Sequence, residues 1–337
     1  MATKVIAATR GGTEPPSGTL KAAVVQAGSF LFDTPRTLAK LTELTRDAAG
    51  RGAQIVVFPE AFVGGYPKGL DFGARIGTRS AEGREDFRRY YESAIEVAGG
   101  ESAQIAAAAR DNGVHLVVGV IERAGATLYC TVLMYAPDGT LLGKHRKLMP
   151  TALERLIWGM GDGSTLTVID SPIGRFGSVI CWENYMPLLR MAMYAQGIEI
   201  YCAPTVDDRE TWLPTMRTIA LEGRCFVLSA CQFLRRSDAP SDYALPPGNA
   251  PDATLIRGGS CIVDPFGEVL SQPVFGEETI RIAELDRRLI ARAKFDLDVA
   301  GHYARPDVFR LTVNSGELTS VDFQPILNGN SLNEAAP

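Results

Sequence analysis

The sequence predicts an α/β protein in which helices cover mixed β-sheets, and three observations lead to this prediction. Short apolar segments typical of buried strands alternate with longer segments whose apolar residues recur at helical spacing. Two strand-like segments, 128–135 and 141–147, flank the hairpin signal Asp138-Gly139, which adds antiparallel pairing. No linker, repeat or low-complexity tract interrupts the interior of the sequence. The pattern therefore favours a single layered domain.

In the first half of the chain, the clearest helix begins at Thr34-Pro35, an N-cap followed by proline at the first helical position. Its apolar residues recur at helical spacing, at Leu38, Leu41, Leu44 and Ala48, before Gly50 and Gly52 end it. A second helix is predicted at 102–110. Strands are predicted at 20–26, 55–58, 115–121, 128–135 and 141–147.

The second half repeats the alternation. Strands are predicted at 176–180, 198–202, 226–230, 260–263 and 279–284, and helices at 188–195, 212–222 and 286–294. A polar, proline-rich segment, 235–257, is predicted to be a surface loop. We expect residues 1–18 to form a flexible N-terminal arm, residues 19–310 one domain, and residues 311–337 a tail mostly too polar to join a core.

The composition of the 337 residues narrows the class of protein. A hydrophobic share of 46% and a charged share of 22% are those of a globular protein with a large core. A net charge of -5 gives no reason to expect a nucleic acid or an anionic membrane as a partner. Apolar runs stay well short of the ~18 residues that span a bilayer. Residues 1–18 lack the apolar centre of a secretory signal.

The six cysteines are predicted to be reduced thiols of a cytoplasmic protein. Five lie in or beside apolar, strand-like segments, at Cys130, Cys202, Cys225, Cys231 and Cys261. No pair has Cys-x-x-Cys spacing and there are only three histidines, so neither a zinc site nor another metal site is expected.

Cys181 differs from the other cysteines because it sits at a corner. The apolar strand 176–180 precedes it, and polar residues, Pro187 and a helical pattern follow it. A thiol placed there would face a helix N-terminus, whose partial positive charge favours the thiolate. The alternative is a small buried hydrophobic residue, which is the usual role of an intracellular cysteine.

Glu60 ends an apolar strand and precedes a glycine-rich loop, which is where open α/β sheets place their ligands. Burial there would raise its pKa and suit it to act as a general base. The alternative is a carboxylate that caps the next loop.

Lys147 belongs to a basic segment that would ordinarily be a solvated edge. Strand alternation nevertheless sends Lys147 and His145 to one face, and Arg146 and Lys144 to the other. One lysine can thus point inward while its neighbours stay in water. Glu154 is either an ion-pair partner of a nearby basic residue or a carboxylate that orients this lysine. A lone histidine such as His302 is expected to be structural.

Three segments, 57–60, 145–150 and 179–184, resemble the catalytic segments of the nitrilase superfamily, which supply a Glu-Lys-Cys triad in that order. The resemblance covers roughly residues 20 to 310 and is greatest to the true nitrilase branch, in particular to plant-type nitrilases. Further segments that carry it are 152–155, 158–163, 198–204, 220–223 and 301–306.

The resemblance implies a four-layer α-β-β-α sandwich with Glu60, Lys147 and Cys181 meeting at one end of two sheets. It implies that Glu154 is a second active-site carboxylate, and that Tyr66 and Trp182 are walls of the substrate pocket. It implies no cofactor and no metal, a small-molecule nitrile as substrate, and a homo-oligomer that is a dimer or a larger spiral.

The expected activity is hydrolysis of an arylaliphatic or aliphatic nitrile to the carboxylic acid and ammonia. Cys181 would form a thioimidate and then an acyl-enzyme, with Glu60 as general base, Lys147 as electrostatic stabiliser and Glu154 as supporting carboxylate. Two alternatives use the same triad: an amidase or carbamoylase, and a cyanide-converting enzyme. A third alternative is a non-catalytic binding scaffold.

Overall fold

The computed structural model describes residues 18–243, 250 and 252–321. The predicted N-terminal arm, except for Gly18, and residues 322–337 of the predicted tail lie outside these ranges. In the described part of the chain, two six-stranded sheets form the centre of the molecule.

The first sheet has the order β16-β1-β2-β5-β6-β7. Its strands in that order are Thr279–Asp286, Thr19–Gln26, Ile55–Val57, His115–Ala124, Thr127–Tyr135 and Leu141–Arg146. Strands β1, β2 and β5 run parallel, whereas β16, β6 and β7 pair antiparallel with their neighbours. The sheet is therefore mixed, as predicted.

The second sheet has the order β15-β14-β11-β10-β9-β8. Its strands in that order are Val269–Ser271, Cys261–Val263, Phe226–Ser229, Ile200–Cys202, Phe176–Ser178 and Val168–Ile169. Strands β9, β10 and β11 are parallel and the outer strands are antiparallel. The short strands β8 and β15 were not predicted.

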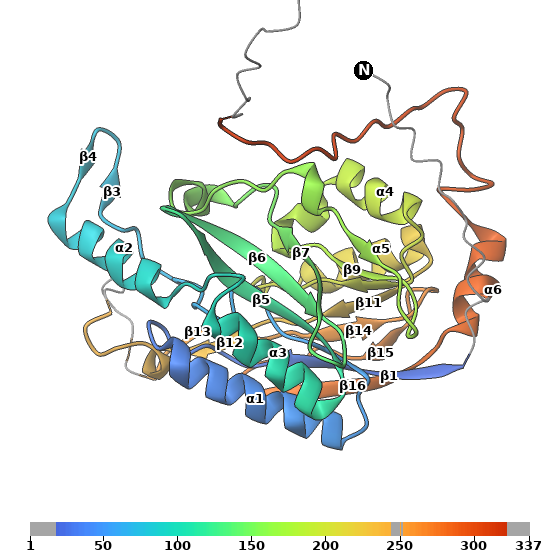
Figure 1. Ribbon diagram of the computed structural model, residues 1–337. Helices are drawn as coiled ribbons and strands as arrows, with labels where there is room; N and C mark the ends of the chain where they lie inside the picture. Colours follow the sequence, from blue (N-terminus) through green and yellow to red (C-terminus); the bar gives the residue numbers. More distant parts are fainter. Residues whose placement is uncertain (1–17, 244–249, 251, 322–337) are drawn as a thin grey trace, which may run out of the picture.

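Helices cover the outer face of each sheet (Figure 1). Helices α1, Thr34–Gly50, and α3, Gly100–Asn112, pack on the first sheet. Helices α4, Pro187–Ala195, and α5, Trp212–Gly223, pack on the second. The remaining helices are α2, Ala81–Ser93, and α6, Arg288–Asp296, with short 3-10 helices at Ala152–Leu156 (η1), Gly163–Thr165 (η2), Cys181–Tyr185 (η3) and Arg236–Asp238 (η4).

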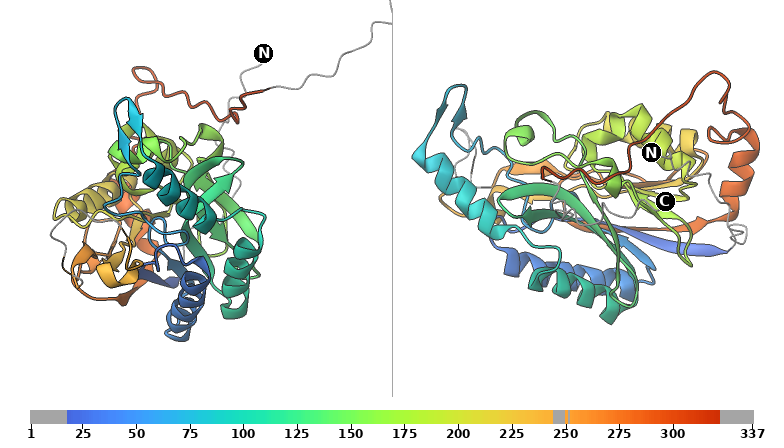
Figure 2. Two further views of the ribbon diagram at one scale, coloured as in Figure 1. Left: turned by 90° about the vertical axis from the view of Figure 1, so that its left-hand side faces the viewer. Right: turned by 45° about the horizontal axis from the view of Figure 1, so that its top comes forward.

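Three apolar clusters lie between the four layers. One joins α1 and α3 to the first sheet, one joins α4 and α5 to the second, and the largest fills the space between the sheets. Figure 2 shows the same layering in two further orientations. The expected four-layer α-β-β-α sandwich is thus confirmed.

Helix α1 illustrates how the sequence sets an element. Asp33 is its N-cap, because its side chain accepts a hydrogen bond of 3.1 Å from the backbone N–H of Arg36. The N-cap therefore lies one residue before the predicted Thr34. The periodic residues Leu38, Leu41 and Ala48 are buried, as their spacing predicts.

The segment 235–257 corrects a prediction. Its ends form a hairpin of β12, Phe233–Arg235, and β13, Thr254–Arg257, with Ile256 fully buried. Tyr243 is also buried. Residues 244–249 and 251 of the segment lie outside the described residues. The surface-loop prediction was wrong at the ends because a few apolar residues anchor an otherwise polar segment.

Helix α2 and the preceding hairpin, β3, Ala74–Arg75, and β4, Thr78–Arg79, were not predicted. They project from one side of the sandwich (Figure 1). Only Gly83, Tyr90 and Ser93 of α2 are buried, because its sequence is rich in charged residues.

Residues 310–321 run extended and are exposed. The backbone N–H of Leu318 nevertheless donates a hydrogen bond of 2.9 Å to Asp162 Oδ2. Within the described ranges, no helix is long and apolar enough to cross a membrane.

Candidate active site

Lys147 lies between two carboxylates at the end of the sandwich. Its Nζ is 2.7 Å from Glu60 Oε1 and 2.8 Å from Glu154 Oε2. The side chains of Lys147 and Glu60 are completely buried, and that of Glu154 is 12% exposed. The structure thus brings together three of the residues that the sequence analysis selected.

Glu60 reaches this place because β2 ends at Val57 and the chain crosses over β5. The crossing passes directly above Gly119, where a Cβ atom would lie 2.2 Å from Pro59 O and 2.7 Å from Glu60 Cα. Only a residue without a side chain fits below the turn. Ala61, next to Glu60, adopts the left-handed backbone region with φ of 50°.

Lys147 directly follows β7, and the predicted alternation of its segment is confirmed. His145 and Lys147 are buried on one side. Lys144 and Arg146 point to the other side, where both form ion pairs with Glu122. Lys147 and His145 therefore face inward, whereas Lys144 and Arg146 are paired with Glu122 on the other side of the strand.

Glu154 sits on η1, where a capping box with Thr151 fixes it. Its Oε2 accepts from the Thr151 backbone N–H at 2.7 Å, and its Oε1 accepts from the Tyr66 hydroxyl at 2.8 Å. The Tyr66 ring packs edge-on against Trp158, whose ring centroid is 5.6 Å from Lys147 Nζ. Tyr66 therefore borders the site through Glu154 and Trp158.

Cys181 follows β9 at the turn between the second sheet and α4. Its backbone N–H donates to Pro204 O at 2.9 Å, and the Thr205 hydroxyl lies 3.2 Å from its Sγ. Its φ of 50° is in the left-handed region, which is unusual for a residue with a side chain. A strained backbone at such a position often accompanies a functional role.

The structure corrects the predicted environment of the thiol. Cys181 begins the 3-10 helix η3, and the α-helix starts only at Pro187. Burial raises the pKa of the Cys181 thiol well above its usual range, and the nearby Glu60 charge raises it further. The resting group is thus a neutral thiol rather than a thiolate, so its reaction requires a base.

Glu60 has the properties of such a base. Burial raises the pKa of its carboxyl above the usual value, although the Lys147 charge acts in the opposite direction. Its Oε2 is buried and has no hydrogen-bond donor among the described residues. One carboxylate oxygen is therefore held by Lys147 while the other is free to accept a proton.

Lys147 remains a cation at this site. Burial alone would lower the pKa of its ammonium group, but Glu60, with further contributions from the neighbouring thiols and Glu154, raises it well above the usual range. The site accordingly holds a fixed positive charge where an anionic intermediate could be stabilised.

Trp182, predicted as a pocket wall, is the residue after Cys181 and is 42% exposed. Its Nε1 donates to Asp207 Oδ2 at 2.8 Å, and the Arg209 guanidinium lies 4.6 Å from its ring centroid. Trp182 is thus a partly exposed side chain held by Asp207 and Arg209, and its role in the pocket stays a prediction.

Sequence reasoning missed Cys130 as a neighbour of the site. It was grouped with the core thiols, but its Sγ lies 3.6 Å from Glu60 Oε1, and its carbonyl accepts from the Lys147 backbone N–H at 2.8 Å. The signal was present in the hairpin: counting outward from Asp138-Gly139 in both directions places Cys130 opposite Lys147. Thr205 and Glu183, which also contact the site, carried no comparable signal.

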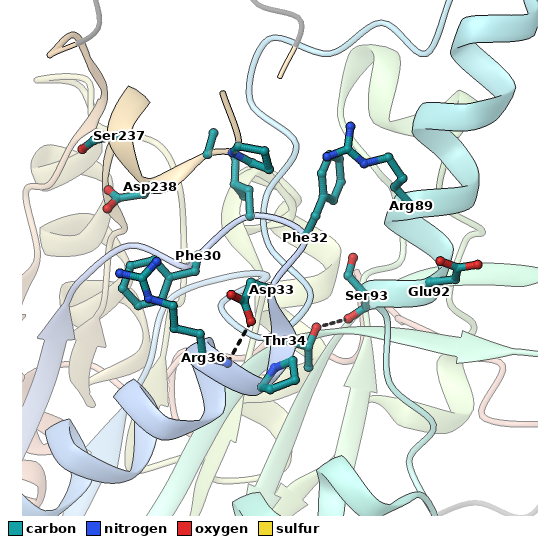
Figure 3. A pocket seen from close by; sticks show the side chains of 14 residues that line it. Phe30, Phe32, Asp33, Thr34, Arg36, Arg89, Glu92, Ser93, Ser237 and Asp238 are labelled. Atoms are coloured by element: carbon teal, nitrogen blue, oxygen red, sulfur yellow. Dashed lines mark hydrogen bonds between the residues drawn. The ribbon is translucent and has the colours of Figure 1, made fainter. Parts of the chain in front are cut away.

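A separate pocket of about 540 Å³ lies where the start of α1 meets α2 and η4 (Figure 3). Arg36 stacks 3.6 Å from the Phe30 ring centroid, and Arg89 lies 4.8 Å from that of Phe32. Neither Glu60, Lys147 nor Cys181 lines it. Across residues 18–243, 250 and 252–321, no group of three His, Cys, Asp or Glu side chains is arranged to hold a metal ion.

The carbon-nitrogen hydrolase family model matches residues 21–295 of the chain. An aliphatic nitrilase from Sinorhizobium fredii is 57% identical over 301 residues, which cover 89% of this chain and 97% of the relative. A bifunctional nitrilase/nitrile hydratase from Lupinus angustifolius is 56% identical over 310 residues, which cover 90% of this chain and 89% of the relative.

Solved structures share the fold at low sequence identity. The NitFhit protein of C. elegans has a TM-score of 0.70 at 20% identity, covering 90% of this chain and 69% of that protein. An amidase from Nesterenkonia sp. has a TM-score of 0.60 at 19% identity, covering 85% of this chain and 98% of that one. At such identities the likeness concerns the fold alone.

Proposed function

The chain belongs to the carbon-nitrogen hydrolase family, within its nitrilase branch, and from this premise we propose that it hydrolyses nitriles by covalent catalysis with Cys181 as the nucleophile. The protein is a hydrolase that acts on the carbon–nitrogen bond of nitriles. The products we assign are a carboxylic acid and ammonia. The observation that carries the proposal is the buried Lys147 ammonium held between Glu60 and Glu154.

The first half of the reaction forms the covalent bond. Glu60 accepts the proton of the Cys181 thiol, and the sulfur attacks the nitrile carbon while the nitrogen gains a proton, giving a thioimidate. Lys147 stabilises the negative charge that develops on nitrogen. Because burial opposes the thiolate, deprotonation and attack should be closely coupled.

The second half releases the products. Water adds to the thioimidate carbon, and the resulting tetrahedral intermediate carries an amino group, a hydroxyl group and the sulfur. Protonation of the amino group expels ammonia and leaves a thioester, which a second water hydrolyses to the acid and the free thiol. Glu60, supported by Glu154, supplies and removes these protons.

The charge balance at the site favours acid over amide. If sulfur left the tetrahedral intermediate first, the product would be the amide. Two carboxylates beside Lys147 should keep the departing nitrogen protonated, which makes ammonia the better leaving group. The name of the bifunctional nitrilase/nitrile hydratase relatives supports expecting amide as a minor product here as well.

The test is a panel of aliphatic and arylaliphatic nitriles with their matching amides, scored for ammonia, acid and amide. We expect acid as the main product from nitriles, and Glu154→Gln should turn over much more slowly with a larger amide share. Much faster hydrolysis of amides than of every nitrile would instead support the amidase alternative.

The preferred substrate and the assembly are also proposals. An aliphatic or arylaliphatic nitrile fits the name of the Sinorhizobium relative and the aromatic residues Tyr66, Trp158 and Trp182 around the site. A homo-oligomer is supported by exposed apolar side chains on the side of η3 and α4, such as Met186 and Leu188. Six free cysteines support a reducing compartment such as the cytoplasm.

A further inference from the structure

The carboxylate of Glu183 links the segments that carry Lys147 and Cys181. Its Oε1 accepts from the backbone N–H of Ile180 at 2.6 Å, and its Oε2 accepts from the backbone N–H of Leu148 at 2.8 Å. Ile180 directly precedes Cys181, and Leu148 directly follows Lys147. One side chain therefore fixes the first sheet's lysine segment against the second sheet's cysteine segment.

His145 completes this arrangement by contacting the same Glu183 oxygen that accepts from Ile180. Its Nε2 is 2.6 Å from Glu183 Oε1 and its Nδ1 is 3.1 Å from Thr165 O. Both partners are hydrogen-bond acceptors, so both ring nitrogens must carry a proton, and the ring is an imidazolium. The cation compensates a carboxylate with 0% exposure, which would otherwise be costly to bury.

We propose that Glu183, held in place by His145, is a positioning residue that sets the distance between the Lys147 ammonium and the Cys181 thiol. The inference rests on the proposed function, because Lys147 can stabilise the charge on nitrogen only when it is correctly placed relative to the attacking sulfur. A displacement of 1 Å between such groups can cost about 100-fold in rate.

The competing interpretation is a buried ion pair that only stabilises the fold. Glu122 provides a matched control because it is also buried and also bonded by basic residues of the same strand, Lys144 and Arg146. Glu122 lies on β5 and pairs with the side chains on the opposite face of β7 from His145. It bonds neither Leu148 nor Ile180. Glu122→Gln should therefore reproduce the loss of a buried carboxylate without moving the two catalytic segments.

The experiment compares Glu183→Gln, Glu122→Gln and the wild type in steady-state kinetics, product ratio and thermal melting. Glu183→Gln places an NH₂ group against a backbone N–H, so one side of the link opens. We expect kcat to fall about 100-fold with KM changed less than about threefold. The amide share should rise. Glu122→Gln should melt at lower temperature with an unchanged product ratio.

His145→Gln is the second variant. If Glu183→Gln does not fold, His145→Gln distinguishes a positioning role of Glu183 from a role in stability alone. It removes the cation but leaves Glu183 and both amides in place, so we expect a smaller loss of kcat in the same direction and the same shift toward amide. Kinetics and product ratio that follow Glu122→Gln in every folded variant would overturn the proposal.

The rate of Cys181 alkylation by iodoacetamide separates this proposal from the proposed function, because it requires no turnover. A changed alkylation rate in Glu183→Gln supports the link even if the wild type hydrolyses no nitrile in the panel. An unchanged alkylation rate together with wild-type kinetics removes the link and leaves the nitrilase reaction intact.

Discussion

At the scale of single residues, the site depends on one cation shared between two carboxylates. Burying an unpaired charge costs several kcal/mol, and breaking a buried pair costs about 3–5 kcal/mol. Glu60, Lys147 and Glu154 thus depend on one another for stability as well as for chemistry. Substitutions among them should be far from additive.

Replacing Cys181 with alanine should abolish nitrile turnover, because the covalent route then lacks its nucleophile. Assays of ammonia release provide the measurement. Cys261→Ser is the control: Cys261 is buried on β14, so the variant should lose thermal stability but keep its kcat. Retention of a tenth of the activity by Cys181→Ala would contradict the thioimidate mechanism.

The raised pKa of Glu60 should appear in the acid limb of the pH profile. Burial outweighs the opposing effect of Lys147, so the carboxyl takes up a proton at a pH above its ordinary value of 4.5. Because the base must be deprotonated, kcat/KM should fall as the pH drops through this pKa. Lys147, whose pKa is raised, should not limit activity at alkaline pH.

Glu154→Gln gives the internal check for this profile. Glu154 is one of the charges that raise the pKa of Glu60, so its neutralisation should move the acid midpoint to lower pH while the rate falls. An acid midpoint at or below 4.5 in the wild type would argue against Glu60 as the base.

At the scale of elements, the β6–β7 hairpin delivers Lys147, and the sequence contained nearly all the information needed. Asp138-Gly139 marks the turn, and alternation points Lys147 inward. Register counted from that turn would also have placed Cys130 beside the lysine. Periodicity likewise predicted α1, α4 and α5, because each buries one apolar face.

The features that the sequence analysis missed depend on contacts between residues far apart in the chain, which local sequence patterns do not reveal. Helix α2 buries few residues, so its stability depends on contacts that are distant in sequence. The state of the Cys181 thiol depends on how deeply the second sheet buries it, which overrides the helix-end effect expected from its position. The Glu183 link joins residues on different sheets, and no spacing of residues in the sequence predicts it.

Gly139→Ala tests the hairpin as the element that carries Lys147. Gly139 has φ of 87°, and an added Cβ would lie 2.8 Å from Ala106 O in α3. We expect a loss of about 2 kcal/mol in unfolding free energy, combining backbone strain with the clash. Chemical denaturation provides the measurement.

Gly125→Ala is the matched control for this substitution. Gly125 also has a positive φ, of 60°, in the neighbouring β5–β6 hairpin, but its added Cβ would meet nothing within 4 Å. Its cost should be limited to backbone strain of about 1 kcal/mol. Equal losses in the two variants would show that contact with α3 does not constrain the hairpin.

At the scale of the whole molecule, the site exists only where the two sheets meet. Glu60 and Lys147 come from the first sheet and Cys181 from the second. Two glutamines strengthen this junction: Gln26 accepts from the N–H groups of Gly259 and Ser260, and Gln232 donates to Glu60 O at 2.7 Å. The packing of the two sheets therefore determines the geometry of the active site.

The assembly prediction belongs to this scale. We expect light scattering to give a mass of at least two chains, because exposed apolar side chains such as Leu188 favour self-association. Removing residues 311–337 should change the size of the assembly without reducing it to single chains. A monomer at assay concentration in the full-length protein would contradict the prediction.

The close approach of the Pro59–Ala61 backbone to Gly119 also limits which substitutions this protein tolerates. A single methyl group there would collide with Pro59 and Glu60, although Gly119 itself performs no chemistry. A directed-evolution library that randomises β5 would thus accumulate inactive members at this codon with every functional side chain still present. Attempts to broaden the substrate range should keep this position invariant and place diversity in the loops around Tyr66 and Trp182 instead.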